Sequence, residues 1–201
     1  MTGVEEPAAP FTEEGAAAAV FADRVDLAGR FVEHLVTSGV ERGLIGPREV
    51  PRIWTRHVLN CAVIEEHIPG NVAICDVGSG AGLPGIALAL ARPDLDVTLV
   101  EPLLRRVTWL QEVVDDLGLD RVRVLRGRAE DMADQVRVDV AVARAVAPLS
   151  GLAAWCLPLL RPGGRLLAIK GRSAAEELDA GRTALTRLGA RSWRIVLSGE
   201  T

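Results

Sequence analysis

The sequence predicts a doubly wound α/β fold, in which helices cover both faces of a parallel sheet, with a helical cap at the N-terminal side. From Gly70 onward, short runs of Val, Ile and Leu alternate with segments of helical periodicity, a pattern typical of strands buried on both faces. Before Gly70 the apolar residues follow helical spacing only. A glycine-rich turn follows the first expected strand, as ligand-binding turns do in such sheets.

The N-terminal part is expected to contain a tail and two helices. Residues 1–14 are rich in Pro, Glu and Thr and predict a mobile tail. Helical spacing runs from Ala16 to Val36 and, after the glycine-rich stretch SGVERGLIGP, from Arg48 to Ile68. We therefore expect a helical region over residues 15–69, packed as one compact unit with an α/β domain over residues 70–201.

The α/β domain is expected to hold six strands and four helices. The strands are predicted at Val72–Asp76, Val97–Glu101, Val122–Arg126, Val138–Ala143, Arg165–Lys170 and Ser192–Leu197. The helices are predicted at Pro84–Ala91, Leu103–Leu117, Leu149–Leu159 and Ala174–Leu188. In sheets of this kind ligands bind outside the carboxyl ends of the strands, so candidate site residues are sought there.

Composition limits the classes of function. A chain of 201 residues, 49% hydrophobic and 25% charged, suits one globular domain. The longest charge-free stretch, Ala145–Leu160, is interrupted by two prolines and is shorter than the ~20 residues that span a membrane. The first 20 residues lack the basic start and apolar run of a signal peptide, and the three cysteines are far apart. We expect a cytoplasmic protein without a membrane anchor or metal site, and its net charge of −4 means that RNA would need a local basic face.

The glycine-rich turn, DVGSGAGLPG at residues 76–85, predicts a nucleoside cofactor. Asp76 ends the first strand, and Gly78, Gly80 and Gly82 let the chain turn sharply before a helix that can start at Pro84. The spacing D-x-G-x-G-x-G departs from the dinucleotide pattern G-x-G-x-x-G. No triphosphate loop is present, because the only lysine is Lys170. The turn therefore favours S-adenosylmethionine over a nicotinamide dinucleotide and excludes a triphosphate.

Two further strand ends carry acidic residues suited to a nucleoside. Glu101 ends the second strand, where a carboxylate can accept both ribose hydroxyls of either cofactor. Glu130, in the segment GRAED after the third strand, offers an acceptor beside backbone N–H groups, which suits the adenine edge. A solvated surface charge is the alternative for each residue taken alone.

Several longer segments carry a family resemblance. With ICDVGSGAGLPGIALALARPDLDVTLVEPLLRRVTWLQEVVDDLGL, RGRAED, VAVARAVAPL and LLAIKGR, the chain closely resembles the RsmG family, also called GidB, and WTRHVLNCAV is similar to its R-H-x-L-[DN] signature. The match covers residues 42–172. It implies a class I, Rossmann-like methyltransferase that uses S-adenosylmethionine to methylate guanine N7 in small-subunit (16S) ribosomal RNA, in the free RNA or in the assembled subunit.

The resemblance also implies site residues. It places cofactor contacts at Gly78, Leu83, Ala129, Glu130 and Arg144, and a ribose contact at Glu101, where the family more often has Asp. The family's sheet usually ends with a sixth strand, a turn and an antiparallel seventh strand inserted between strands five and six. The printed sequence stops just after SWRIVLSGE, so we assign no segment to that last strand.

The implied chemistry needs positioning but no general base. Guanine N7 has a lone pair and no proton, so catalysis rests on alignment and on stabilising the shifting charge. We expect Arg144 and Lys170 to position the substrate, with Arg144 also able to contact guanine O6. The Asp- or Asn-Pro-Pro-aromatic loop common in amino-group methyltransferases is absent from this sequence, and Cys156, within an expected helix, is better explained by packing than as a nucleophile.

RNA contacts are expected on a basic strip. Its expected members are Arg52, Arg56, His57 and Arg172, and Arg42, Arg48, Arg105 and Arg106 could extend it. We expect a monomer. Three other functions stay open: a methyltransferase for a small molecule or protein, with an enclosed apolar pocket; a nicotinamide-dependent oxidoreductase; and a binding module that has lost catalysis.

Overall fold

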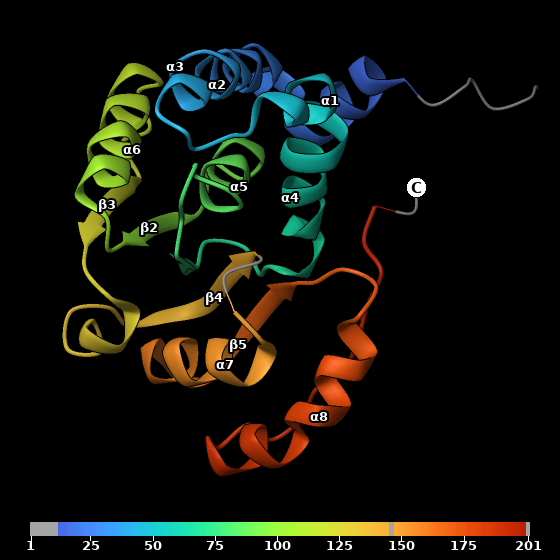
Figure 1. The fold of residues 1–201 in the computed structure, drawn as a ribbon, viewed down its shortest axis with the longest axis vertical. Coiled ribbons are helices and arrows are strands. Elements are labelled where there is room, and N and C mark those ends of the chain that lie inside the picture. Colours follow the sequence, from blue (N-terminus) through green and yellow to red (C-terminus); the bar gives the residue numbers. More distant parts are fainter. Residues whose placement is uncertain (1–11, 145–146, 200–201) are drawn as a thin grey trace, which may run out of the picture.

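The computed structural model describes residues 12–144 and 147–199, and its centre is a five-stranded parallel sheet (Figure 1). The strands are β1 (Ala73–Val77), β2 (Asp96–Glu101), β3 (Val122–Arg126), β4 (Val138–Arg144) and β5 (Leu160–Ile169). Their spatial order is β3-β2-β1-β4-β5, and every neighbouring pair is parallel. The strand order reverses between β1 and β4, so the carboxyl ends of these strands meet where ligands of doubly wound sheets bind.

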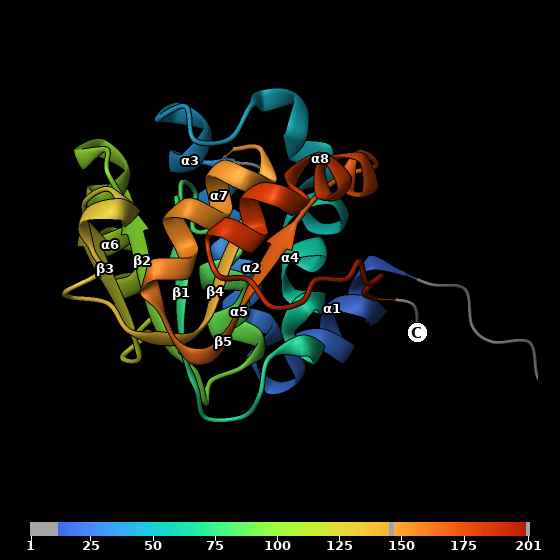
Figure 2. The same ribbon diagram turned by 90° about the horizontal axis from the view of Figure 1, so that it is seen from below.

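Helices cover both faces of the sheet, which confirms the predicted fold class. On one face, α5 (Gly85–Ala91) and α6 (Leu104–Asp116) share a core with Ile74 of β1; on the other, α7 (Leu149–Cys156) packs against Cys75. The alternation of Ile74 and Cys75 between the two cores follows from the period of two residues along a strand. The last helix, α8 (Ala174–Arg187), lies against α7 (Figure 2). Within the described residues, no helix is both long and apolar enough to cross a membrane.

The N-terminal helices form a layer over the outer side of α5 (Figures 1 and 2). This layer holds α1 (Glu13–Phe21), α2 (Val25–Val36), α3 (Ser38–Glu41) and α4 (Asn60–Ala62). Phe21 and Phe31 are buried in the same hydrophobic core as α5 and α6. Trp109 of α6 is fully buried, and its Nε1 donates to Ser38 Oγ at 2.9 Å. The helical region and the sheet domain therefore share one core. The expected tail, residues 1–14, lies mostly outside the described residues, and Thr12 caps α1 by accepting from Gly15 N.

Neither N-terminal helix is as regular as predicted. The expected helix over 16–36 is interrupted at Ala22, whose φ of 48° lies in the left-handed region and ends α1. The second expected helix, over 48–68, combines a 3-10 turn at Pro47–Arg52, a π-helix at Ile53–Leu59, α4 and a 3-10 turn at Val63–His67. Pro51 has no N–H to donate, so a regular α-helical hydrogen-bond ladder cannot run through it.

The strand predicted over 192–197 is wrong. No strand forms there among the described residues, and Ser198 Oγ instead lies 3.0 Å from His67 Nε2 of the helical region. Ile195, Val196 and Leu197 are 50%, 43% and 74% exposed. Their apolar, β-branched pattern suits a strand, but a strand also needs a neighbouring strand to take its backbone hydrogen bonds, and local sequence does not supply one.

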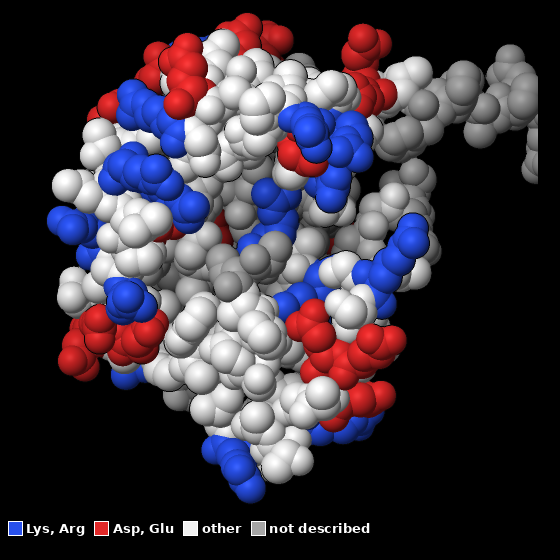
Figure 3. Space-filling model, in the orientation of Figure 1, with Lys and Arg blue, Asp and Glu red and all other residues white. Residues whose placement is uncertain are grey.

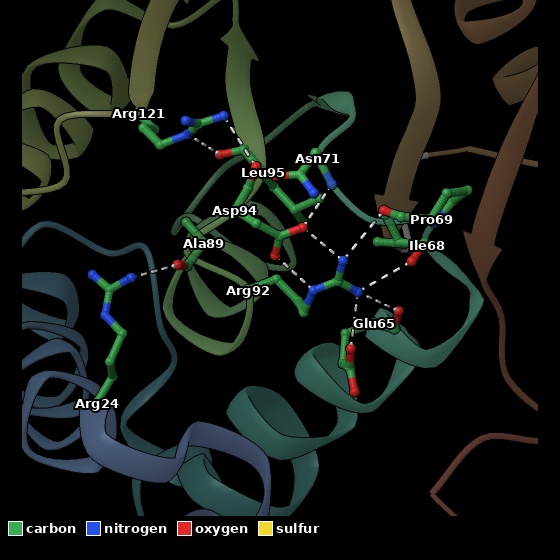
Figure 4. Close-up of polar contacts among 10 residues, drawn as sticks. All are labelled: Arg24, Glu65, Ile68, Pro69, Asn71, Ala89, Arg92, Asp94, Leu95 and Arg121. Atoms are coloured by element: carbon green, nitrogen blue, oxygen red, sulfur yellow. Dashed lines mark hydrogen bonds and ion pairs between the residues drawn. The ribbon is translucent and has the colours of Figure 1, made fainter.

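Arg92, just after α5, joins the helical region to the sheet domain (Figure 4). Its guanidinium donates to both carboxylate oxygens of Asp94 at 2.8 Å, to the Glu65 carboxylate at 3.2 Å, and to the carbonyls of Ile68 at 3.1 Å and Pro69 at 3.3 Å. The hydrogen bonds from Arg92 hold the pKa of Asp94 well below its usual range. Arg92 therefore fixes the chain that enters β1.

Replacing Arg92 with leucine should lower the free energy of unfolding by about 2 kcal/mol, because two carbonyl groups and two carboxylates lose this donor. Urea unfolding at pH 7 measures this loss. Arg121→Leu is the matched control: Arg121 also donates to backbone carbonyls and pairs with Asp96, but its side chain is 51% exposed. The control should lose less than about 1 kcal/mol. Equal losses in the two variants would contradict the assigned role.

Candidate functional site

The glycine-rich turn lies at the carboxyl end of β1, beside the point where strand order reverses. Gly78, Gly80 and Gly82 have φ angles of 74°, 55° and 76°, which glycine adopts without strain. The N–H groups of Gly78 and Ser79 both donate to Val100 O, at 2.9 and 3.2 Å, and hold the turn against β2. A Cβ at Gly82 would also lie 2.5 Å from Ile86 Cδ1. The turn therefore needs its glycines both for conformation and for close packing.

Asp76 connects this turn to the start of α5. Its side chain is 1% exposed, and its Oδ2 accepts from Gly85 N, the first residue of the helix, at 2.9 Å. Pro84, expected as the first helical residue, is the N-cap, and the Leu83–Pro84 bond is cis. A Cβ at Gly85 would overlap Leu99 Cδ2 and lie 2.7 Å from Asp76 Oδ2, so only glycine lets the helix approach the sheet this closely.

One oxygen of Asp76 is left for a further partner. Oδ1 is buried and has no hydrogen-bond partner among the described residues. Burial raises the pKa of Asp76 to about 7, and the hydrogen bond from Gly85, the nearby Ser79 hydroxyl and the charge of Arg144 act in the opposite direction. Ser79 Oγ itself donates to the Asp76 backbone carbonyl at 3.0 Å. Because buried polar atoms are nearly always hydrogen-bonded, an unpartnered carboxylate oxygen beside a glycine turn fits a cationic or N–H donor from a ligand.

Glu101 closes the next loop onto the turn. The residue is 1% exposed, and its two oxygens accept from Gly80 N and from Leu103 N, each at 3.0 Å. Arg106 Nη1 lies 3.6 Å from the same carboxylate. Each oxygen keeps a second lone pair, which is the capacity that ribose hydroxyls would use. The structure thus places Glu101 next to the turn, as the sequence indicates.

The loop after β3 lies at the same edge. Gly127 N donates to Glu101 O at 3.2 Å, which ties this loop to the end of β2. Ala129, 6% exposed, begins a 3-10 turn at Ala129–Asp131, and Glu130 is exposed. The loops after β1, β2 and β3 are thus joined in series by hydrogen bonds, and together they carry the expected cofactor residues Asp76, Gly78, Gly80, Gly82, Leu83, Glu101, Ala129 and Glu130.

Arg144, the last residue of β4, lies on the other side of Asp76. Its Nη1 donates to His57 Nδ1 at 3.2 Å, and its charge counteracts the burial that raises the pKa of Cys61 to about 12. His57 and Cys61 belong to the helical region, so that region forms one wall of the site. A π-helix such as Ile53–Leu59, which carries His57, is common at functional sites.

The expected RNA contacts divide into two kinds. Arg52 and Arg56 pair with Glu49 at 3.1 and 3.2 Å and are 54% and 56% exposed, so both guanidinium groups can be reached from solvent. His57 shares Glu49 but is only 15% exposed, and its ring contacts Arg144. Figure 3 shows Lys and Arg side chains on both sides of a hollow in the middle of this face, with acidic side chains among them.

The Lys170 ammonium group is bound to other residues of the same chain. Its Nζ donates to Ala147 O at 2.6 Å and pairs with Glu177 at 2.9 Å, and its side chain is 12% exposed. Glu177 also accepts from Ser173 Oγ and Leu149 N, so the group ties the β4–α7 connection to α8. This placement favours a loop-holding role, whereas Arg172, two residues further on, is exposed. The motif residues Ala145 and Val146 lie outside the described residues.

Sequence reasoning missed Glu49, which lies at the centre of the basic group. Eight residues separate Glu49 from His57, a spacing that does not place two side chains together on a regular helix. The 3-10 and π segments between them shift the helical phase and bring Glu49 Oε2 to 2.8 Å from His57 Nε2. The only signal in the sequence was Pro51, which marks the irregularity.

Comparison with protein families and curated proteins gives a consistent match. The family model described as "GidB: rRNA small subunit methyltransferase G" matches residues 24–201. A "Ribosomal RNA small subunit methyltransferase G" of Pseudarthrobacter chlorophenolicus is 60% identical over 185 residues, 92% of this chain and 86% of the relative. Proteins of the same name from Streptomyces avermitilis (59% identical; 90% of this chain and 76% of the relative) and Rhodococcus jostii (57%; 96% and 86%) are also similar.

Solved structures agree with the fold. A ribosomal protein L11 methylase from Lactobacillus delbrueckii subsp. bulgaricus superposes with a TM-score of 0.53 at 19% identity, covering 66% of this chain and 68% of that chain. A precorrin-6y C5,15-methyltransferase from Geobacter metallireducens gives a TM-score of 0.51 at 14% identity, covering 73% of each chain. At these identities the likeness concerns the fold, which is that of class I methyltransferases.

Proposed function

The chain belongs to the rRNA small subunit methyltransferase G (GidB) family and is thus a methyltransferase of small-subunit rRNA, and we propose that it methylates N7 of one guanine in 16S rRNA. The observation that carries the proposal is the position of Arg144, which ends β4 beside the cofactor turn and contacts the helical region that carries the exposed Arg52 and Arg56. Arg144 would thus contact the guanine, while Arg52 and Arg56, in the adjoining helical region, would contact the phosphates of the RNA backbone.

The site residues fit S-adenosylmethionine as the methyl donor. When bound, this cofactor supplies an activated methyl group on a positively charged sulfur. Asp76 Oδ1, buried and unpartnered, suits the ammonium of its amino-acid part. The turn at Gly78, Gly80, Gly82 and Leu83 would allow the cofactor a close approach, because its glycines carry no side chains. Glu101 would accept the ribose hydroxyls, and Ala129 and Glu130 would contact adenine.

The substrate requires alignment more than proton transfer. Guanine N7 attacks with a lone pair and releases no proton, so a general base has no task. Arg144 can donate to O6, next to N7, and thereby orient the base for in-line attack on the methyl group. Arg52, Arg56 and Arg172 would hold phosphates, which fixes the register of the RNA without reading its sequence. Lys170 would contribute by holding the loop after Arg144.

We also propose that the protein acts as a monomer in the bacterial cytoplasm. Cys61, Cys75 and Cys156 are buried free thiols, which suits a reducing compartment. Light scattering at working concentration, with a mass of one 21.4 kDa chain expected, tests the monomer. A stable mass of two chains would contradict it.

Methyl transfer from labelled S-adenosylmethionine tests the function. We expect incorporation into small subunits from a strain that lacks this methylation, none into large subunits, and chain cleavage at one guanine after N7-specific chemical treatment of the RNA. Small subunits from the wild-type strain are the control, because their site is already methylated. Free 16S rRNA and assembled subunits, compared in parallel, identify the form that is methylated.

The same assay distinguishes the other functions. Cofactor binding without incorporation into any RNA would point to a small-molecule or protein substrate. Calorimetric binding of NAD in place of S-adenosylmethionine would point to an oxidoreductase. If the protein bound S-adenosylmethionine and RNA without any methyl transfer, so that Arg144→Ala had no turnover to lose, it would be a binding module.

A further inference from the structure

Three side chains form a continuous hydrogen-bonded series from the protein surface to the carboxyl end of β4. Glu49 Oε2 lies 2.8 Å from His57 Nε2, and His57 Nδ1 lies 3.2 Å from Arg144 Nη1. Glu49 comes from the 3-10 turn Pro47–Arg52, His57 from the π-helix Ile53–Leu59, and Arg144 from the end of β4. The hydrogen bonds among these three side chains therefore link the helical region to the sheet at the proposed site of methyl transfer.

The partners of His57 determine its tautomer. A guanidinium can only donate, so His57 Nδ1 must carry a lone pair towards Arg144. The proton of the neutral ring then lies on Nε2 and is donated to the Glu49 carboxylate. Both ring nitrogens are thus satisfied by one tautomer, and a doubly protonated ring would lose the bond to Arg144. With a side chain only 15% exposed, the ring is held in one orientation.

Glu49 is kept ionised by its surroundings. The hydrogen bond from His57, followed by the charges of Arg56 and Arg52, lowers the pKa of Glu49. An ionised carboxylate accepts hydrogen bonds only, so Glu49 always selects the ring form with the proton on Nε2. The arrangement matches other histidines whose second nitrogen is fixed by a carboxylate, where the carboxylate controls what the first nitrogen can bind.

We propose that Glu49 and His57 are positioning residues for methyl transfer: Glu49 fixes the tautomer of His57, and His57 holds the Arg144 guanidinium in place beside the cofactor turn. The inference rests on the proposed function and deepens it, because it assigns His57 to the alignment of Arg144 and away from direct contact with RNA. Free rotation would let the long Arg144 side chain leave its productive position, and misplacement by about 1 Å can cost about 100-fold in rate.

Kinetics of two His57 variants test the proposal. His57→Leu removes the acceptor and should lower kcat by about 10 to 100-fold while KM for the small subunit changes less than about twofold. His57→Asn keeps an acceptor near the position of Nδ1 and should recover part of kcat. A rise in KM with unchanged kcat in both variants would instead assign His57 to RNA binding and overturn the proposal.

A double-mutant cycle shows whether His57 acts through Arg144. In an Arg144→Ala background, His57→Leu should lower kcat by less than about twofold, because the group that it positions is gone. Multiplicative losses would contradict the proposal. His34→Leu is the matched control, since His34 makes the same kind of contact with Asp116, at 2.9 Å, away from the site, and its turnover should match the wild type.

NMR of the wild type and of a Glu49 variant tests the tautomer of His57 without requiring enzymatic turnover. Nitrogen-15 NMR of histidine-labelled protein should show the His57 ring protonated on Nε2, and Glu49→Ala should mix the two tautomers. Glu49 is at the surface, so this variant also serves if His57→Leu fails to fold. Should the wild type methylate no RNA while NMR shows the expected tautomer, the proposed function fails and the Glu49–His57–Arg144 arrangement stands. Mixed tautomers in the wild type would overturn the arrangement itself.

Discussion

Replacing Gly85 with alanine should lower the free energy of unfolding by about 3 kcal/mol and weaken S-adenosylmethionine binding in the same variant. A Cβ at this position would overlap Leu99 Cδ2 and approach Asp76 Oδ2 to 2.7 Å. Leu99 and Asp76 are 0% and 1% exposed, so neither can move aside. The helix would have to shift away from the sheet and lengthen the 2.9 Å bond from Gly85 N to Asp76, and overpacking of this kind is strongly destabilising.

Urea unfolding and calorimetry measure the two effects of Gly85→Ala. Gly29→Ala is the matched control, because Gly29 lies within α2 and an added Cβ would meet nothing within 4 Å. That control should be neutral or gain up to about 1 kcal/mol from the better helix propensity of alanine, with unchanged cofactor affinity. A Gly85→Ala protein within about 0.5 kcal/mol of the wild type would show that the turn can relax, against our interpretation.

The α/β part of the fold could be predicted because local pattern and global structure agree there. The strand at Val122–Arg126 has the predicted bounds, β2 and β4 differ by one residue at one end, and β1 differs by one residue at each end. The strands β1, β2 and β4 are largely apolar runs bounded by turn residues, as burial on both faces requires, whereas β3 lies at the edge of the sheet and is only partly buried. The segment over 192–197 has the same composition but depends on a distant pairing partner, which no local pattern specifies.

The site could be predicted in its cofactor half and less well in its substrate half. The turn and the acidic strand ends are local to single loops, so the spacing along the chain places them. The Glu49–His57–Arg144 contacts join segments 87 residues apart in sequence and depend on an irregular helix. Lys170 and Arg172 are two residues apart, yet Lys170 is paired with Glu177 and Arg172 is exposed, a difference that depends on where α8, which carries Glu177, packs against α7.

The Asp76→Asn variant without cofactor should be more stable than the wild type above pH 7, by up to about 4 kcal/mol. Burial raises the pKa of Asp76 to about 7 from an ordinary 3.8. Between these values the folded protein keeps a proton that the unfolded chain releases, so the free energy of unfolding falls as the pH rises, at about 1.4 kcal/mol per unit. An asparagine can still accept from Gly85 N and has no charge to bury, so the decline should be absent from the variant.

Urea unfolding of both proteins from pH 4.5 to 8.5 measures the difference. Asp139→Asn is the control: Arg161 lowers the pKa of Asp139, so that contribution is lost only as the pH falls below about 4, and the wild-type slope above pH 5 should remain. Parallel curves for Asp76→Asn and the wild type would show that Asp76 does not titrate with a raised pKa.

A stability gain in Asp76→Asn should come with a loss of function. S-Adenosylmethionine binding should weaken in the variant, because the unpartnered Oδ1 that would accept the ammonium becomes an amide N–H₂ group. Saturating cofactor should therefore stabilise the wild type at pH 8 more than it stabilises the variant. At neutral pH the buried Asp76 carboxylate destabilises the free protein. Its presence is explained if the ligand supplies the positive charge that neutralises it. Such a residue contributes to binding at the expense of stability. Equal stabilisation of both proteins by the cofactor would contradict a role for the Asp76 carboxylate in cofactor binding.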